Sequence, residues 1–131
     1  MALKASLLMI LLLASAAAGA GSNGLRLEVE VALGNEFDDL AQVLPGAVEC
    51  IVAKQPERCG IKEFGLEHLT ENRIRTLFSG DVVTVSLSGR AGAGREIRAE
   101  FSPTSGPEVG VIYFRRIKGV LSPVAASIAI P

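Results

Sequence analysis

The chain has 131 residues, enough for one domain, and its 13 basic and 14 acidic side chains give a formal charge of −1. This balance argues against a dedicated nucleic-acid-binding protein, which needs a strongly basic face. Two cysteines and one histidine are too few for the four Cys or His ligands of a typical zinc site. We therefore expect no nucleic acid partner, no metal and no cofactor.

The first twenty residues have the organisation of a secretory signal peptide. MALK is a short basic n-region, ASLLMILLLASAA is an apolar h-region, and Ala18-Gly19-Ala20 supplies the small residues that a signal peptidase requires. The apolar run over residues 5–18 is shorter than the roughly 20 residues that span a bilayer, although a retained membrane anchor is the alternative. We predict cleavage after Ala20, a single mature domain of residues 21–131 and no membrane span after cleavage. The protein is then exported, either secreted or periplasmic.

Cys50 and Cys59 are separated by eight residues. An even number of cysteines in an exported chain predicts a disulfide. A metal pair would need further ligands, and His68 is the only histidine. A thioredoxin-like redox pair would need Cys-x-x-Cys spacing. We predict a structural disulfide between Cys50 and Cys59.

The first half of the mature chain predicts one strand and then helices. Residues 25–33 alternate strictly between apolar and polar side chains, which is typical of a half-buried strand. Apolar residues at helical spacing follow Asn35, a helix N-cap residue, and Pro45-Gly46 interrupts this stripe, so a second short helix over residues 47–54 is expected. A further helix is predicted over residues 64–78, or from a later start if Thr70 is its N-cap.

The second half predicts an antiparallel meander. Residues 81–117 contain three strands joined by turns rich in glycine and proline; the third, over residues 109–114, is apolar on both faces and should be covered on both. A last strand over residues 124–130, flanked by Pro123 and Pro131, is expected at a sheet edge. The expected fold is α+β: a mostly antiparallel sheet of four or five strands, two or three helices packed on one face, and one disulfide.

The motifs of common enzyme classes are incomplete. The glycines of residues 89–94 have the spacing of a phosphate-binding loop, but Arg95-Glu96 follows instead of Lys and Ser or Thr, and a strand follows instead of a helix. His68 has no recognisable nucleophile context. Asp38-Asp39 fits the charge preference of a helix N-terminus, while Glu96 and Glu100 fit the exposed face of a strand with cross-strand pairing. We assign no catalytic residue.

Six cations follow or flank the predicted strands and are the candidate partner-binding residues: Arg90, Arg95, Arg98, Arg115, Arg116 and Lys118. Gathered together, they would form a surface that binds an anion or a protein partner. The alternative is a solvated surface of mixed charge, because Glu96, Glu100 and Glu108 are interspersed among them.

Without a catalytic constellation, the sequence favours a small exported, non-catalytic binding or assembly protein that acts through protein–protein contacts. The apolar residues 120–130 could pair with a partner by strand addition, and deletion of residues 120–131 would then leave the fold intact. The alternative is a small exported hydrolase or hydrolase inhibitor, for which His68 or a carboxylate would be indispensable.

Overall fold

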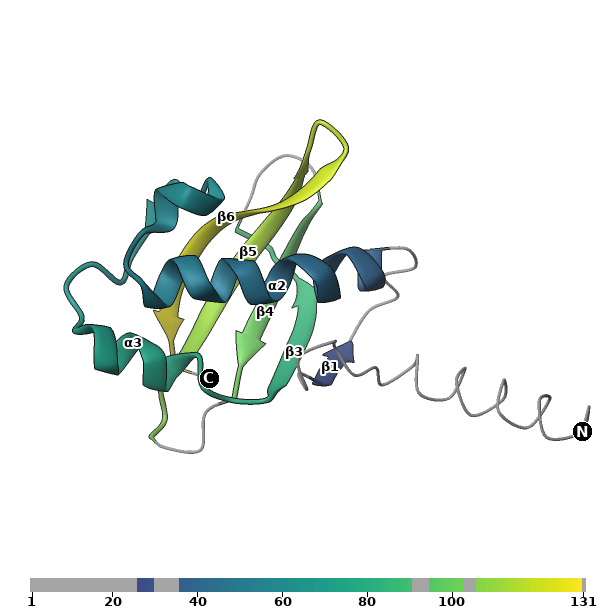
Figure 1. Cartoon of the computed structure of the whole chain (residues 1–131). Coiled ribbons are helices and arrows are strands. Elements are labelled where there is room, and N and C mark those ends of the chain that lie inside the picture. Colours follow the sequence, from purple (N-terminus) through teal and green to yellow (C-terminus); the bar gives the residue numbers. More distant parts are fainter. Residues whose placement is uncertain (1–25, 30–35, 91–94, 103–105, 131) are drawn as a thin grey trace, which may run out of the picture.

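The computed structural model describes residues 26–29, 36–90, 95–102 and 106–130 (Figure 1). The predicted signal peptide and its cleavage site lie outside these residues. In the described part of the chain, no helix is both long enough and apolar enough to cross a membrane.

A single sheet of six strands organises the domain, in the order β1-β3-β4-β5-β6-β2. The strands are β1 (Arg26–Val29), β2 (Glu63–Phe64), β3 (Val82–Leu87), β4 (Glu96–Phe101), β5 (Val109–Ile117) and β6 (Val120–Ala129). The two outermost strands pair in parallel, β1 with β3 and β2 with β6, and the other neighbours are antiparallel. The α+β prediction is confirmed. The sheet has one strand more than the expected four or five. The additional strand is β2, which has two residues and overlaps the start of the helix predicted over residues 64–78.

The first helix, α2 (Glu36–Val52), runs across the sheet and is continuous through Pro45 (Figure 1). The predicted interruption at Pro45-Gly46 is therefore wrong. A proline in a helix interior costs about 3 kcal/mol. Leu40, Leu44 and Ile51, which are fully buried on both sides of it, each contribute about 1.5–3 kcal/mol. Burial of one uninterrupted apolar stripe outweighs the local cost.

The second helix, α3 (Glu71–Leu77), begins later than residue 64 because Thr70 is its N-cap. The Thr70 hydroxyl accepts a hydrogen bond from the Arg73 N–H at 3.1 Å, which satisfies one of the free donors at the helix start. The alternative with the later start is thus correct. His68 lies in an exposed turn before the helix and not on it.

The predicted disulfide is present. Cys50, near the end of α2, is bonded to Cys59 at the end of the short 3₁₀-helix η1 (Pro56–Cys59), with a Cα–Cα distance of 6.2 Å. The bond fixes the connection that follows α2 against that helix.

The sheet has two distinct faces, which the register defines. The helix face carries the apolar side chains that pack with α2 and α3 to form the core. From the strands, these are Leu27, Val83, Val85, Ile97, Ala99, Phe101, Ile112, Phe114 and Ala126. The opposite face, called here the charged face, carries Glu96, Arg98, Glu100, Val111, Tyr113, Arg115, Ala125 and Ser127. The prediction that residues 109–114 are covered on both faces is confirmed for residues 109–112 and Phe114, whereas Tyr113 is only partly buried.

The last strand is more firmly built into the sheet than the sequence indicated. β6 has 10 residues, includes Pro123, and pairs with β5 along its length with a bulge near Tyr113 and Phe114. It contributes Leu121, Ala125 and Ala126 to the buried apolar set. Deletion of residues 120–131 would remove these core side chains and the pairing partner of β5, which argues against the expectation that the fold survives this deletion. β6 is also not the outermost strand, since β2 pairs beyond it.

Candidate functional site

The charged face contains a carboxylate that is removed from solvent. The Glu96 side chain is 0% exposed and lies between two cations, with Oε1 at 2.8 Å from Arg90 Nε and Oε2 at 3.3 Å from Arg115. The sequence placed Glu96 on an exposed strand face. Its cross-strand pairing with Arg115 agrees with that interpretation, but its burial corrects it. Long polar side chains cover this face with their apolar stems.

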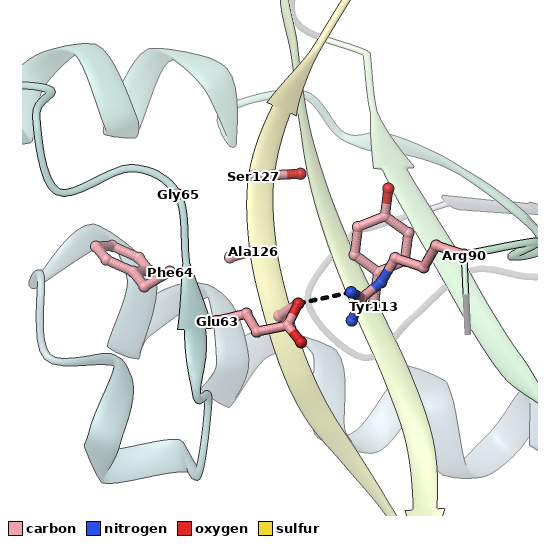
Figure 2. Close-up of a pocket in the computed structure, with 8 residues that line it drawn as sticks. Glu63, Phe64, Gly65, Arg90, Tyr113, Ala126 and Ser127 are labelled. Atoms are coloured by element: carbon pink, nitrogen blue, oxygen red, sulfur yellow. Dashed lines mark hydrogen bonds and ion pairs between the residues drawn. The ribbon is translucent and has the colours of Figure 1, made fainter. Parts of the chain in front are cut away.

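The Arg90 guanidinium connects three strands from its position just after β3. It lies over the Tyr113 ring of β5, 4.4 Å from the ring centroid, and donates a hydrogen bond to Glu63 of β2 at 2.6 Å. Its Nε faces Glu96 of β4. Figure 2 shows Glu63 and Arg90 reaching toward each other beside Tyr113, while Phe64 points the other way. Cation–π and ionic contacts together hold the guanidinium in one place.

A second ion pair lies beside this cluster on the charged face. Arg98 donates a hydrogen bond to Glu100 at 2.7 Å. Burial alone disfavours the charged guanidinium, but hydrogen bonds with Glu100 and Tyr113 outweigh it and raise the pKa of Arg98. Arg98 is therefore a positive charge held beside Glu100, across from Tyr113 in the sheet register.

Next to Arg90 the charged face is hollowed into an open pocket of about 410 Å³. The pocket exists because β6 presents small side chains, Ala125 and Ser127, between the larger Glu63, Arg90 and Tyr113 (Figure 2). It combines a small apolar floor with a few convergent polar groups, which is the usual composition of a binding site.

The pocket adjoins an open stretch of sheet edge. β2 pairs with β6 only as far as Gly65, whose N–H donates to the Ala126 carbonyl at 2.9 Å. Backbone groups alternate in direction along a strand, so the N–H and C=O of Ile128 also point away from β5. In the described part of the chain they have no hydrogen-bond partner. The edge at residues 128–130 therefore has no paired strand in the described part of the chain; Ile128 and Ala129 are partly buried and Ile130 is 74% exposed.

The six predicted partner-binding cations do not form one patch. Arg90, Arg98 and Arg115 share the charged face, where Glu63, Glu96 and Glu100 pair with them. Two others reach the acidic first turn of α2: Arg95 pairs with Glu36 at 3.5 Å and Arg116 with Asp39 at 2.6 Å. Lys118 lies exposed in the turn between β5 and β6.

The other residues considered from sequence make no further site within the described ranges. Residues 91–94 of the glycine loop are outside those ranges, and no group of three or more His, Cys, Asp or Glu is arranged to hold a metal ion inside them. Asp38 and Asp39 lie in the first turn of α2, as expected from the helix dipole. Glu108 pairs with Arg73 of α3 and not with the charged face.

Of the polar side chains that line the pocket, the sequence identifies only Arg90 as a candidate and misses Glu63, Tyr113 and Ser127. Glu63 lies outside every predicted strand, and Tyr113 belongs to a predicted apolar run. A usable signal was present in β6, where the alternate residues Ala125 and Ser127 are small and leave space between larger neighbours. The partners across that space could not be derived, since they depend on the parallel pairing of β2 with β6.

No protein family matches this chain, and neither curated proteins nor solved structures show a significant similarity to it.

Proposed function

We propose that this chain is an exported, non-catalytic binding protein that captures an extended segment of a partner protein by strand addition to the β6 edge. The observation that carries the proposal is that the N–H and C=O of Ile128, directly beyond the point where β2 leaves β6, have no hydrogen-bond partner among the described residues. The export predicted from residues 1–20 places this capture in the periplasm or outside the cell.

Two features beside the edge support this mode of recognition. In strand addition, main-chain hydrogen bonds supply affinity, and pockets for alternate side chains supply specificity. The pocket between Ser127, Tyr113 and Arg90 lies next to this edge, on one face of the sheet. On the other face Ile128 packs against the core, which holds the edge in a fixed position.

Hydrogen exchange of the Ile128 amide tests the proposal directly. In the free protein this amide should exchange much faster than the amides of Ser127 and Ala129, which point toward β5. Peptides selected from a random display library on the immobilised protein should have alternating β-branched residues. When a selected peptide binds, exchange at Ile128 should slow markedly.

A pair of substitutions at one position provides the matched control. Ile128→Pro removes the outward N–H without removing a β5–β6 hydrogen bond, whereas Ile128→Ala loses similar packing but keeps the N–H. Selected peptides should bind the alanine variant and fail to bind the proline variant. Equal binding to both, or unchanged exchange at Ile128 in the complex, would show that the partner does not add to this edge.

A further inference from the structure

We infer that the pocket beside Arg90 recognises an acidic side chain of the captured segment, whose carboxylate takes the place of the Glu63 carboxylate on the Arg90 guanidinium. This inference deepens the proposed strand addition and rests on it for the identity of the ligand as a peptide. The contacts of Arg90 with Glu96, Tyr113 and Glu63 determine the chemistry of the site itself.

The Arg90 guanidinium is already oriented for an anion. Its Nε faces the fully buried Glu96 at 2.8 Å, and its plane lies over Tyr113. Only the remaining edge, which donates to Glu63 at 2.6 Å, is directed toward the pocket. A guanidinium held by its Nε and its face loses little conformational freedom when it binds a carboxylate at its free edge.

Glu63 is the replaceable member of this cluster. Its side chain is 65% exposed, in contrast to the 0% of Glu96, and it belongs to a strand of only two residues. An exposed ion pair of this kind contributes little to stability. When Glu63 turns into solvent, Arg90 and Arg115 face the single charge of Glu96, and the pocket becomes a cationic site.

The buried Glu96 is an independent sign that this cluster is more than a surface ion pair. Glu96 Oε1 accepts no hydrogen bond from the described residues despite its short distance to Arg90 Nε. The contact is therefore an ion pair without the geometry of a hydrogen bond. Arg115 Nε is likewise buried without a hydrogen-bond partner there.

The pocket reaches the free part of the sheet edge. Glu63 lies opposite Ala125 on the charged face, and Gly65 lies beside Ser127. Because Gly65 carries no side chain, the pocket is open above it and continues from Ser127 to Arg90. An added strand begins beyond Gly65, and a long acidic side chain at its near end would enter the pocket across Gly65, toward the Arg90 guanidinium.

The test uses N-acetylglutamate methylamide, a single-residue probe whose side-chain carboxylate is its only charge, and the matching glutamine compound. Binding is followed by the NMR signals of the Arg90 Nε–H and of the Ser127 amide, which also lies at the pocket and is kept in every variant. The glutamate probe should shift these signals and the glutamine probe should not. Glu63→Gln should tighten binding roughly two- to fivefold by removing the competing carboxylate, and Arg90→Gln should weaken it at least roughly tenfold.

Glu28→Gln is the matched control, because Glu28 is also an exposed strand carboxylate paired with an arginine, at the opposite edge of the sheet. It should leave probe binding unchanged. Equal binding of the two probes, or unchanged affinity in Glu63→Gln, would overturn the inference even if Arg90→Gln fails to fold. The probe is too short to add as a strand, so Ile128→Pro should still bind it. Failure of strand addition is therefore distinguished from failure of the acidic pocket.

Discussion

The two faces of the sheet are covered to different degrees and by different side chains. The helix face is closed to solvent by apolar side chains packed against α2 and α3, among them Phe101 and Phe114, each at most 1% exposed. The charged face is partly covered by arginine, glutamate and tyrosine side chains that lie across the strands and pair with one another. The first arrangement stabilises through burial of area. The second stabilises little in net terms, because desolvation offsets ionic attraction, yet it fixes side chains in defined places.

The largest contrast should come from neighbouring residues of β5 that face opposite ways. Phe114→Ala should lower the free energy of unfolding by about 3–5 kcal/mol, because a fully buried aromatic side chain leaves a cavity in the core. Tyr113→Ala should cost about 1–2 kcal/mol, from the lost contact with Arg90 and the lost packing of a partly buried ring. Chemical denaturation of both variants measures the difference. Equal losses would show that the charged face is a second core.

The buried carboxylate gives the next largest effect. Glu96→Gln should cost about 1.5–3 kcal/mol, since Arg90 and Arg115 both lose a charged partner at a site closed to solvent. Glu28→Gln, the same change at an exposed pair with Arg26, should cost at most about 1 kcal/mol. Urea unfolding at low and high salt compares them: salt should reduce the Glu28 effect far more than the Glu96 effect. A Glu96 effect as small and as salt-sensitive as that of Glu28 would contradict the buried pair.

The difference between the faces also explains what the sequence could predict. Val83, Val85, Ile97, Ala99 and Phe101 alternate with polar residues, and this period of two identified β3 and β4 together with their inward face. The disulfide followed from cysteine number and spacing. Element boundaries were less accurate where a tertiary contact competes with a local signal, as at Pro45, where core burial keeps the helix intact.

The charged face could not be assembled from the sequence in the same way. Its arginines were recognised as candidates, but which carboxylate meets which arginine depends on register and on the two-residue β2, which has almost no sequence signal. Glu96 is buried although glutamate side chains are usually exposed, so its burial could not be expected from the residue type. The small residues of β6 were the only sequence signal for a hollow. They indicate a pocket only once Glu63 and Arg90 are known to lie on its other side.

A close approach on the helix face provides the third test. A Cβ at Gly110 would lie 2.6 Å from the Phe78 ring, which packs edge-on against Phe101. Gly110→Ala should therefore cost about 1–3 kcal/mol through overpacking. In the double variant with Phe78→Leu, which removes the ring, the alanine should cost less than it does alone. Purely additive losses in this double-mutant cycle would show that the Phe78 ring is not the reason why position 110 requires glycine.

The smallest effect is expected at the protruding tip of the β5–β6 hairpin, where both faces end (Figure 1). Lys118 and Gly119 have φ of 52° and 80°, as in a two-residue type I′ turn, for which Asn-Gly is the preferred sequence. Lysine is strained in this left-handed conformation and asparagine is not, so Lys118→Asn should raise the free energy of unfolding by up to about 1 kcal/mol. Lys62→Asn removes an equally exposed charge at a position without positive φ and should give no gain. Similar shifts in the two variants would assign the effect to charge and not to the turn. If Lys118→Asn also keeps full affinity for the selected peptides, Lys118 lies outside the binding site.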